Sequence, residues 1–422
     1  MKTSMSLETV LETARTIENR AVDYIAPVGR LGMKHHTNYI HTYISDAMGV
    51  ERSETPDALV LQLDTPKGAV NGELTDSAFR QLCTKLRIPS QYAEMLRDEE
   101  IPSEVGDEWS LDTGRGMLTK LSRKTYPKAT PLLSGMINHG LRNGDQNLYR
   151  MLRGLLPEET GGTQKWRAIL SNQYLPIPSV SILDRAMMHC NNLYKSNGYR
   201  AELKSAEVNE DRLYAKFIFP DMVSRPLRTR RQNDIVQIGF VLYNNEIGSG
   251  SYGVRSFVEF LACTNGMILP KWSTNLTKVH RTGRIEMDGD IVVSSETRRA
   301  QIEASLSELS DMINTVIAPE RLERLTKAVE YAASSPDIAD AHIQKTVQKI
   351  AKAEVLSETE SNAVYQAFIR GNDLGQFGMS QAICSNDVAR TLSFERATHL
   401  ETVAGRVLTM DRGEWSRLAV AA

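Results

Sequence analysis

The stretch YNNEIGSGSYGVRSFVEFLACTNGMILP, residues 243–270, decides how the middle of this chain is interpreted. Its glycines Gly248, Gly250 and Gly253 match the spacing GxGxxG of a dinucleotide-binding loop. That fingerprint also requires a helix after the loop and an acidic residue about twenty positions further on. Here a short run rich in Val and Phe follows and stops at Asn265-Gly266. We therefore predict a glycine turn between two strands, and a nucleotide-binding enzyme that uses this turn is the alternative.

The sequence around this stretch continues the strand pattern. WRAILS (166–171), YRAELKSAEVNEDRLYAKFIFP (199–220) and DIVQIGFVLYNN (234–245) are rich in β-branched and aromatic residues, several of them alternating. From residue 302 onward the period changes, and the apolar residues recur at intervals of four, three, four and three, which predicts an amphipathic helix with a heptad-like seam. The residues of this seam are Ile302, Leu306, Leu309, Ile313 and Val316.

These patterns predict an α+β fold, with a central, mainly antiparallel sheet, flanking helices and a C-terminal helical bundle. We expect an N-terminal α/β element at 1–110, a basic α+β core domain at 111–300 and a C-terminal helical region at 301–422. In the first segment DALVLQLD (57–64) predicts a strand, and Asn71-Gly72 predicts a turn.

Local signals also predict where individual helices begin and end. Ser181 and Asp184 indicate a capping-type start for a helix that Gly198 ends. Ser357 and Glu360 have the spacing of a capping box before a further helix in the tail.

Composition excludes several classes of protein. The four cysteines are far apart and form no CxxC pair, which argues against a disulfide framework or a zinc ribbon and favours buried thiols. The histidines His35, His36 and His41 lack partners at a ligand spacing, so we expect no metal and no cofactor. No apolar stretch is long enough for a membrane span, and the start lacks an apolar signal region. We expect a cytoplasmic protein that does not bind membranes, and because no catalytic set assembles, more likely not an enzyme.

Charge is distributed unevenly along the chain. Residues 111–300 contain 27 Lys and Arg against 17 Asp and Glu, whereas residues 1–110 contain 11 against 18 and residues 301–422 contain 12 against 17. A basic middle between acidic flanks is typical of a segment that meets a polyanion.

The basic middle supplies candidate nucleic-acid-binding residues. Arginines on a connection between strands can neutralise phosphates, and aromatic rings beside cations can stack on the bases of a single strand. We expect phosphate contacts from the cations and stacking from Trp272 and Tyr252. The candidate cations are Arg225, Arg228, Arg230 and Arg231 on the connection, Lys120, Arg123 and Lys124 in an earlier basic stretch, and Lys271, Lys278 and Arg281 beside the sheet.

The segments RAILSNQYLPIPSVSILD (167–184), VLYNNEIGSGSYGVRSFVEFLACTNGMI (241–268) and KVHR (278–281) resemble the prokaryotic and phage family called domain of unknown function 932, or phage/plasmid-like protein. Within residues 243–268 the match is carried by Asn245, Glu246, Gly248, Gly250 and Val254, and by the CysThrAsnGly run at 263–266, whereas Phe257 to Phe260 depart from the family pattern. The resemblance covers about residues 165–300 and implies a protein of a mobile element, with a relation to phage single-strand annealing proteins.

Together the charge and the resemblance predict a phage or mobile-element DNA-binding protein that favours single strands and acts in annealing, recombination or replication. Besides the nucleotide-binding enzyme, the alternative is a host-directed interaction or inhibitor protein. The seam at 302–316 is a candidate surface for forming a homo-oligomer.

Overall fold

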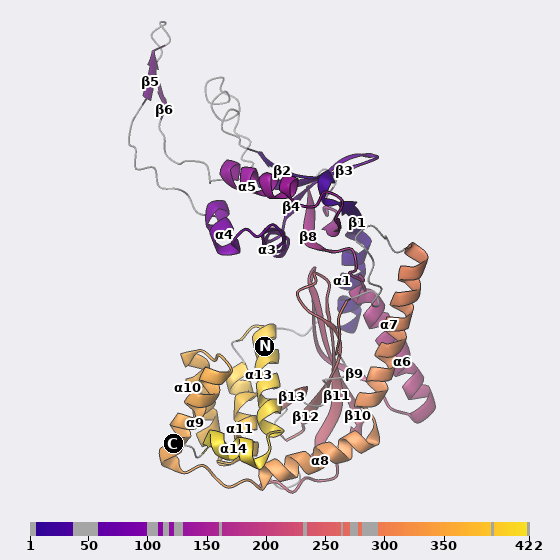
Figure 1. Cartoon of the computed structure of the whole chain (residues 1–422). Helices are drawn as coiled ribbons and strands as arrows, with labels where there is room; N and C mark the ends of the chain where they lie inside the picture. The colour runs from indigo at the N-terminus through magenta and orange to yellow at the C-terminus, as the bar shows by residue number, and fades with distance from the viewer. Residues whose placement is uncertain are drawn as a thin grey trace. The chain divides into compact units, whose positions relative to one another are not determined.

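A computed structural model gives the structure of the protein (Figure 1). The described residues are 6–36, 58–98, 109–112, 118–121, 130–159, 163–230, 234–262, 265–270, 277–280, 294–389 and 392–419. They form two compact units. Unit 1 holds the described residues of 6–18, 175–280 and 295–419, and unit 2 holds those between 19 and 174.

Unit 2 is built on a six-stranded mixed sheet in the order β1-β7-β8-β4-β3-β2. All neighbouring strands are antiparallel except β4 and β8, which run parallel. A separate antiparallel pair is formed by β5 (Trp109–Asp112) and β6 (Leu118–Leu121). The strands of the sheet are β1 (Ala21–Pro27), β2 (Leu31–His36), β3 (Ala58–Thr65), β4 (Gly68–Leu74), β7 (Tyr149–Leu155) and β8 (Gln164–Ser171).

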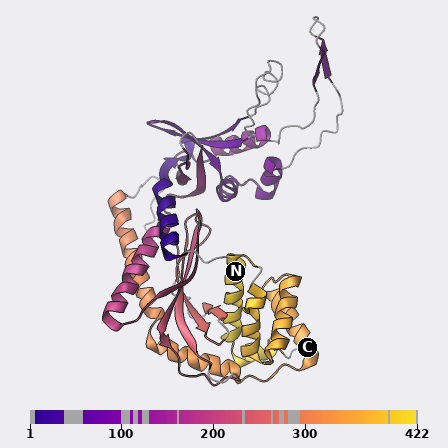
Figure 2. The same cartoon turned by 180° about the vertical axis from the view of Figure 1, so that it is seen from behind.

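Three helices cover this sheet with one shared core (Figure 2). They are α3 (Asp76–Lys85), α4 (Ser90–Asp98) and α5 (Thr130–Asn143), and a short 3-10 turn, η1 (Val28–Arg30), connects β1 to β2. Phe79 and Leu82 of α3, Ile137 of α5 and Trp166 of β8 are almost fully buried in this core. Packing of α3 and α5 in this core places the C-terminal ends of both helices next to β7.

Unit 1 is built on an antiparallel sheet in the order β13-β12-β11-β10-β9, with β14 paired to β12. The strands are β9 (Glu202–Val208), β10 (Arg212–Val223), β11 (Val236–Asn245), β12 (Tyr252–Phe260), β13 (Asn265–Ile268) and β14 (Thr277–Lys278). Most residues of β11 and β12 are buried, as expected for the central strands of a covered sheet.

Two long helices, α6 (Ser179–Asn197) and α7 (Ser295–Val316), pack against each other and against β11, and α7 also packs on β12 (Figure 1). The backbone N–H of Ser179 donates to the buried Glu246 carboxylate at 2.8 Å, and Asn244 Nδ2 donates to the Ser179 hydroxyl at 3.1 Å. These bonds fasten the start of α6 to the end of β11, and helix α1 (Leu7–Arg20) adds an ion pair from Arg15 to Asp184.

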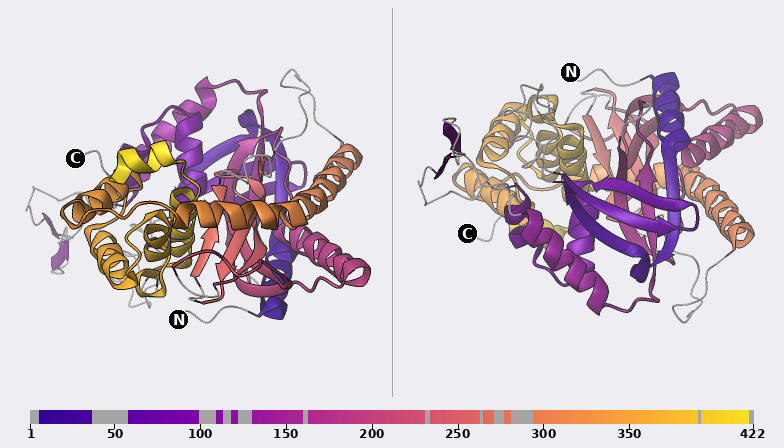
Figure 3. Two further views of the ribbon diagram at one scale, coloured as in Figure 1. Left: turned by 90° about the horizontal axis from the view of Figure 1, so that it is seen from below. Right: turned by 90° about the horizontal axis from the view of Figure 1, so that it is seen from above.

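The C-terminal helices form a bundle, and α8 leads to it across one end of the unit 1 sheet (Figure 3). The bundle shares a core with β12 and β13, in which Phe260 packs against Phe377 with ring centroids 5.5 Å apart. Helix α13 is held to β10 by Lys216, whose Nζ lies 2.7 and 2.5 Å from the two Glu401 oxygens. The helices are α8 (Pro319–Ala333), α9 (Asp340–Ala353), α10 (Glu358–Gly371), α11 (Gln376–Ile383), α12 (Asn386–Ala389), α13 (Phe394–Leu408) and α14 (Arg412–Ala419).

The predicted α+β fold with its mainly antiparallel sheet and C-terminal helices is confirmed. The division of the chain differs from the predicted boundaries at 110 and 300, because β7 and β8 pair with strands from the first 75 residues and so belong to unit 2. The seam from Ile302 to Val316 lies in α7 and faces inward: Leu306, Leu309, Ile313 and Val316 are buried within the chain. They are therefore not available as an oligomer surface.

Candidate functional site

The arginine connection, on which the predicted phosphate contacts depend, is paired with carboxylates of the helical tail. Arg225 makes two hydrogen bonds to Glu330 of α8, at 2.6 and 2.9 Å. Arg230 bonds to Asp337 at 3.0 and 2.5 Å. Arg228 is exposed, and its backbone N–H also donates to Glu330. The connection therefore fastens β10 and β11 to the tail, and two of its guanidiniums already have acidic partners.

The same pairing extends over the rest of unit 1. Five cations between residues 212 and 278 form ion pairs with carboxylates between residues 308 and 401, which neutralises five of the 27 cations that the sequence places in residues 111–300. The pairs are Arg212 with Glu395, Lys216 with Glu401, Arg225 with Glu330, Arg230 with Asp337 and Lys278 with Glu308.

The predicted stacking residue Tyr252 is buried, with 3% of its surface exposed, and its ring lies 5.0 Å from that of the buried His280. Burial raises the pKa of its hydroxyl. Tyr252 therefore packs in the core and presents no face to a base. Lys120 lies in β6. The remaining candidates lie outside the described residues: Arg123, Lys124, Arg231, Lys271, Trp272 and Arg281.

The glycine turn joins the antiparallel strands β11 and β12, as predicted. Asn245 Oδ1 accepts the backbone N–H of Ser249 at 3.0 Å, and Gly248 and Gly253 have φ values of 73° and 150°, in the region that favours glycine. A strand follows the glycines where the dinucleotide fingerprint requires a helix.

Unit 2 contains a pocket of about 430 Å³ where the ends of α3 and α5 meet β7. Its floor is the edge of the unit 2 core, with Leu82, Leu141 and Ile169 nearly fully buried. Its rim carries Lys85 and Arg87 from the end of α3, and Arg150 from β7. An apolar floor with a few convergent polar groups is the usual construction of a ligand site, and the volume lies in the usual range. We call this the Lys85–Arg150 pocket.

The three rim cations form no ion pair with any described carboxylate. Asp145 is the one acid that lines the pocket, and its Oδ1 accepts the backbone N–H of Asn147 at 3.0 Å. Partial burial and the nearby Arg150 guanidinium lower the pKa of Lys85, and burial lowers the pKa of Arg150. Two neighbouring, partly desolvated like charges repel each other, so a bound anion would relieve this repulsion.

The backbone at Arg87, at the end of α3, is strained. Helix α3 ends in a Schellman motif, in which the Ile88 N–H donates to the Cys83 carbonyl and the Arg87 N–H to that of Thr84. Arg87 has a φ of 57°, at the position where helices usually place glycine. A side chain in this left-handed conformation costs about 1–2 kcal/mol, and strain of this kind is concentrated at functional sites.

Further cations that pair with no described carboxylate flank the pocket along the chain. Arg30 follows Val28 and Arg142 follows Leu141, both next to lining residues, and both are exposed. Arg142 Nε donates to the Asn138 carbonyl, and no described carboxylate pairs with either side chain. Arg142 lies in the last turn of α5, where the partial negative charge of the terminal carbonyls stabilises its guanidinium.

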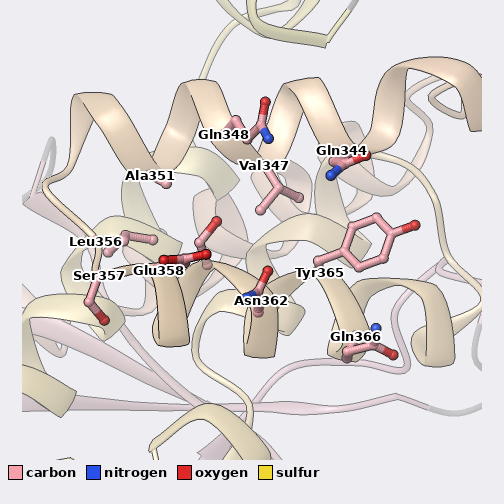
Figure 4. A pocket seen from close by; sticks show the side chains of 11 residues that line it. Gln344, Val347, Gln348, Ala351, Leu356, Ser357, Glu358, Asn362, Tyr365 and Gln366 are labelled. Carbon is pink, nitrogen blue, oxygen red and sulfur yellow. The ribbon is translucent and has the colours of Figure 1, made fainter.

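A second hollow of about 450 Å³ lies between α9 and α10 in unit 1 (Figure 4). Gln344 and Gln348 of α9 lie across from Tyr365 and Asn362 of α10. Its lining contains one carboxylate, Glu358, and no cation. This groove therefore offers hydrogen-bonding amides but nothing that would attract a phosphate.

Other kinds of site find no support in the described part of the chain. No group of three or more His, Cys, Asp and Glu there could hold a metal ion. Cys83, Cys190 and Cys384 are buried free thiols, as predicted, and burial raises the pKa of Cys83 to about 11 and that of Cys190 to about 12. Within the described ranges, every helix is too short or too polar to span a membrane.

Comparisons of the chain with family models, curated proteins and solved structures give no match.

The residues that line the Lys85–Arg150 pocket were not among the site residues predicted from the sequence. The signal that could have indicated it is local: apolar residues recur at helical spacing at Ala78, Leu82 and Leu86, and Arg87 follows at the place where a glycine is expected, with Lys85 two residues before it.

Proposed function

We propose that this protein binds single-stranded nucleic acid, with DNA of a phage or mobile element as the natural ligand, and that the cations around the Lys85–Arg150 pocket carry the binding. The observation that supports this most directly is the set of exposed or half-exposed cations in unit 2 that lack described acidic partners: Arg30, Lys85, Arg87, Arg142 and Arg150. Each phosphate that they neutralise releases counterions, which supplies affinity without reading sequence.

The apolar floor favours single strands over duplex. A duplex presents phosphates outside and keeps its bases stacked, whereas a single strand offers phosphates and exposed bases together. Leu86 and Leu148 are partly buried and line the pocket together with the cations, so a base can rest on apolar side chains while its phosphate meets the rim. The resemblance of residues 165–300 to a phage and plasmid family makes annealing, recombination or replication the expected setting.

The test is fluorescence anisotropy of a labelled oligonucleotide, single-stranded or duplex, across a salt series. We expect tighter binding of the single strand, an affinity that falls with salt, and a loss of about tenfold or more for the double variant Lys85→Gln, Arg150→Gln. A matched control is Lys67→Gln, Lys165→Gln, which removes the same charge from unit 2. Lys165 pairs with Leu155 in the sheet and Arg150 with Ser171, so Lys165 lies at the other end of β8 from the pocket.

Equal losses in both double variants would show that net charge alone, and not this pocket, governs binding. An affinity that does not depend on salt would contradict the proposal altogether.

A further inference from the structure

We infer that the Lys85–Arg150 pocket recognises a phosphomonoester attached to a nucleoside, as found at a phosphorylated strand end or in a free mononucleotide. The inference rests on the proposed function and adds to it the group that the pocket itself selects. Internal phosphates of the strand would then lie on the flanking cations, Arg30 and Arg142, outside the pocket.

The charge of the pocket fits a dianion better than a monoanion. Among the described residues three cations and one carboxylate line it, so its side chains have an excess of two positive charges, which the terminal carbonyls of α3 and α5 offset in part. An internal phosphodiester carries one negative charge, whereas a phosphomonoester carries about 1.5 to 2 at neutral pH and has three acceptor oxygens. The terminal group therefore compensates the cations more completely, and the guanidiniums of Arg87 and Arg150 can each donate two hydrogen bonds to it.

The structural elements that carry the rim cations support a specific ligand-binding site. Lys85 and Arg87 are two residues apart at the end of α3, and Arg150 comes from a separate element, β7. Two of the three lie on regular elements that the unit 2 core holds rigid, and the third keeps a left-handed backbone that glycine would adopt more easily. Solvated surface lysines need no such arrangement.

The apolar floor of the pocket indicates that the phosphate is attached to a nucleoside. Beyond the cations the pocket is lined by the partly buried Leu31, Leu86 and Leu148, which offer an apolar surface and no charge. Inorganic phosphate would leave this surface in water, whereas a nucleoside covers it with its base and sugar. We therefore expect a mononucleotide to bind more tightly than phosphate alone.

The experiment compares oligonucleotides of one sequence that end in a 5′-phosphate, a 3′-phosphate or hydroxyl groups, with the full chain and the two double variants. We expect one phosphorylated form to bind about tenfold more tightly than the hydroxyl form, with this ratio falling to about one in Lys85→Gln, Arg150→Gln and persisting in Lys67→Gln, Lys165→Gln. Equal affinities in the unmodified protein, with strand binding intact, would overturn the inference and leave the proposed function standing. A ratio that survives in Lys85→Gln, Arg150→Gln would also overturn it.

A second arm distinguishes the two sources of the phosphomonoester and tests the floor. Calorimetric titrations with deoxyadenosine 5′-monophosphate, deoxyadenosine and inorganic phosphate should rank the monophosphate first by at least tenfold. Equal binding of monophosphate and inorganic phosphate would refute the role of the floor. If the monophosphate binds in a Lys85- and Arg150-dependent manner while strands do not bind, the pocket is a mononucleotide site and the proposed function fails instead.

Discussion

Replacing Arg87 by Gly should stabilise unit 2 while weakening strand binding. Arg87 has a φ of 57° at the end of α3, where a side chain costs about 1–2 kcal/mol. Glycine removes this cost but loses about 0.5–1 kcal/mol more backbone entropy on folding. The difference leaves a net gain of about 1 kcal/mol, and Arg87→Ala, which keeps a Cβ, should show none of it.

The binding effect of the same change follows from one lost phosphate contact. For single strands each contact contributes about 0.7 to the slope of log affinity against log salt, so the slope should become shallower by about that amount. At 0.1 M salt this corresponds to about a fivefold weaker affinity. Arg87→Gly and Arg87→Ala should lose affinity equally, and Arg87→Lys should retain most of it.

The assays are urea unfolding, amide hydrogen exchange in α3, and anisotropy across a salt series. Exchange in α3 isolates the local effect from unfolding of unit 1. If Arg87→Gly and Arg87→Ala have the same stability, the left-handed backbone carries no strain and the reasoning is wrong. If both variants bind strands as well as the unmodified protein, Arg87 makes no phosphate contact.

Three further predictions concern the rest of the fold. The hydrogen bonds from the Arg396 guanidinium lower the pKa of Glu360 to about 2, against burial, which raises it. Because this folded-state pKa lies below that of the unfolded chain, Glu360→Gln should lose about 3 kcal/mol at pH 7. This difference should shrink as pH falls from about 5 to 2 in urea titrations, and a difference that does not change with pH would contradict it. A Cβ on Gly405 of α13 would lie 1.9 Å from the Ile268 carbonyl oxygen, so Gly405→Ala should destabilise unit 1 by about 3 kcal/mol. Gly135→Ala, in α5 with nothing within 4 Å, should instead raise stability by about 0.5–1 kcal/mol in thermal unfolding, and equal effects of the two would refute the packing argument. Finally, Arg225→Gln with Arg230→Gln should lower stability only slightly, since both pairs are partly exposed, and should change strand affinity less than twofold; a tenfold loss would return binding to the arginine connection.

Elements that depend on neighbouring residues could be predicted from the sequence. The strands β9 to β12, the helix α7 and the capping box of Ser357 and Glu360 all occur where their local patterns indicate. Gly198 ends α6 with a φ of 76°, also as predicted. In each case the deciding interactions lie within a few residues along the chain.

Predictions failed where a distant partner overrides the local signal. Asn71-Gly72, predicted as a turn, lies inside β4, because Gly72 makes room for the Trp166 indole of β8; a Cβ there would lie 2.6 Å from Trp166 Nε1. The predicted cap of Ser181 and Asp184 is also wrong. Helix α6 begins at Ser179, and its first N–H is satisfied by Glu246 from the end of β11.

The same limit explains why the candidate site moved from the middle of the sequence to unit 2. A count of charges along the chain treats every cation alike, but a cation can attract a phosphate strongly only if no carboxylate already neutralises it. Arg225 and Arg230 have partners more than a hundred residues away, which no local pattern reveals. Lys85 and Arg150 come from segments of ordinary composition, and only the pairing of β7 with β8 beside α3 brings them together. The charge left after ion pairing, and not the charge of a segment, is therefore what points to the polyanion site.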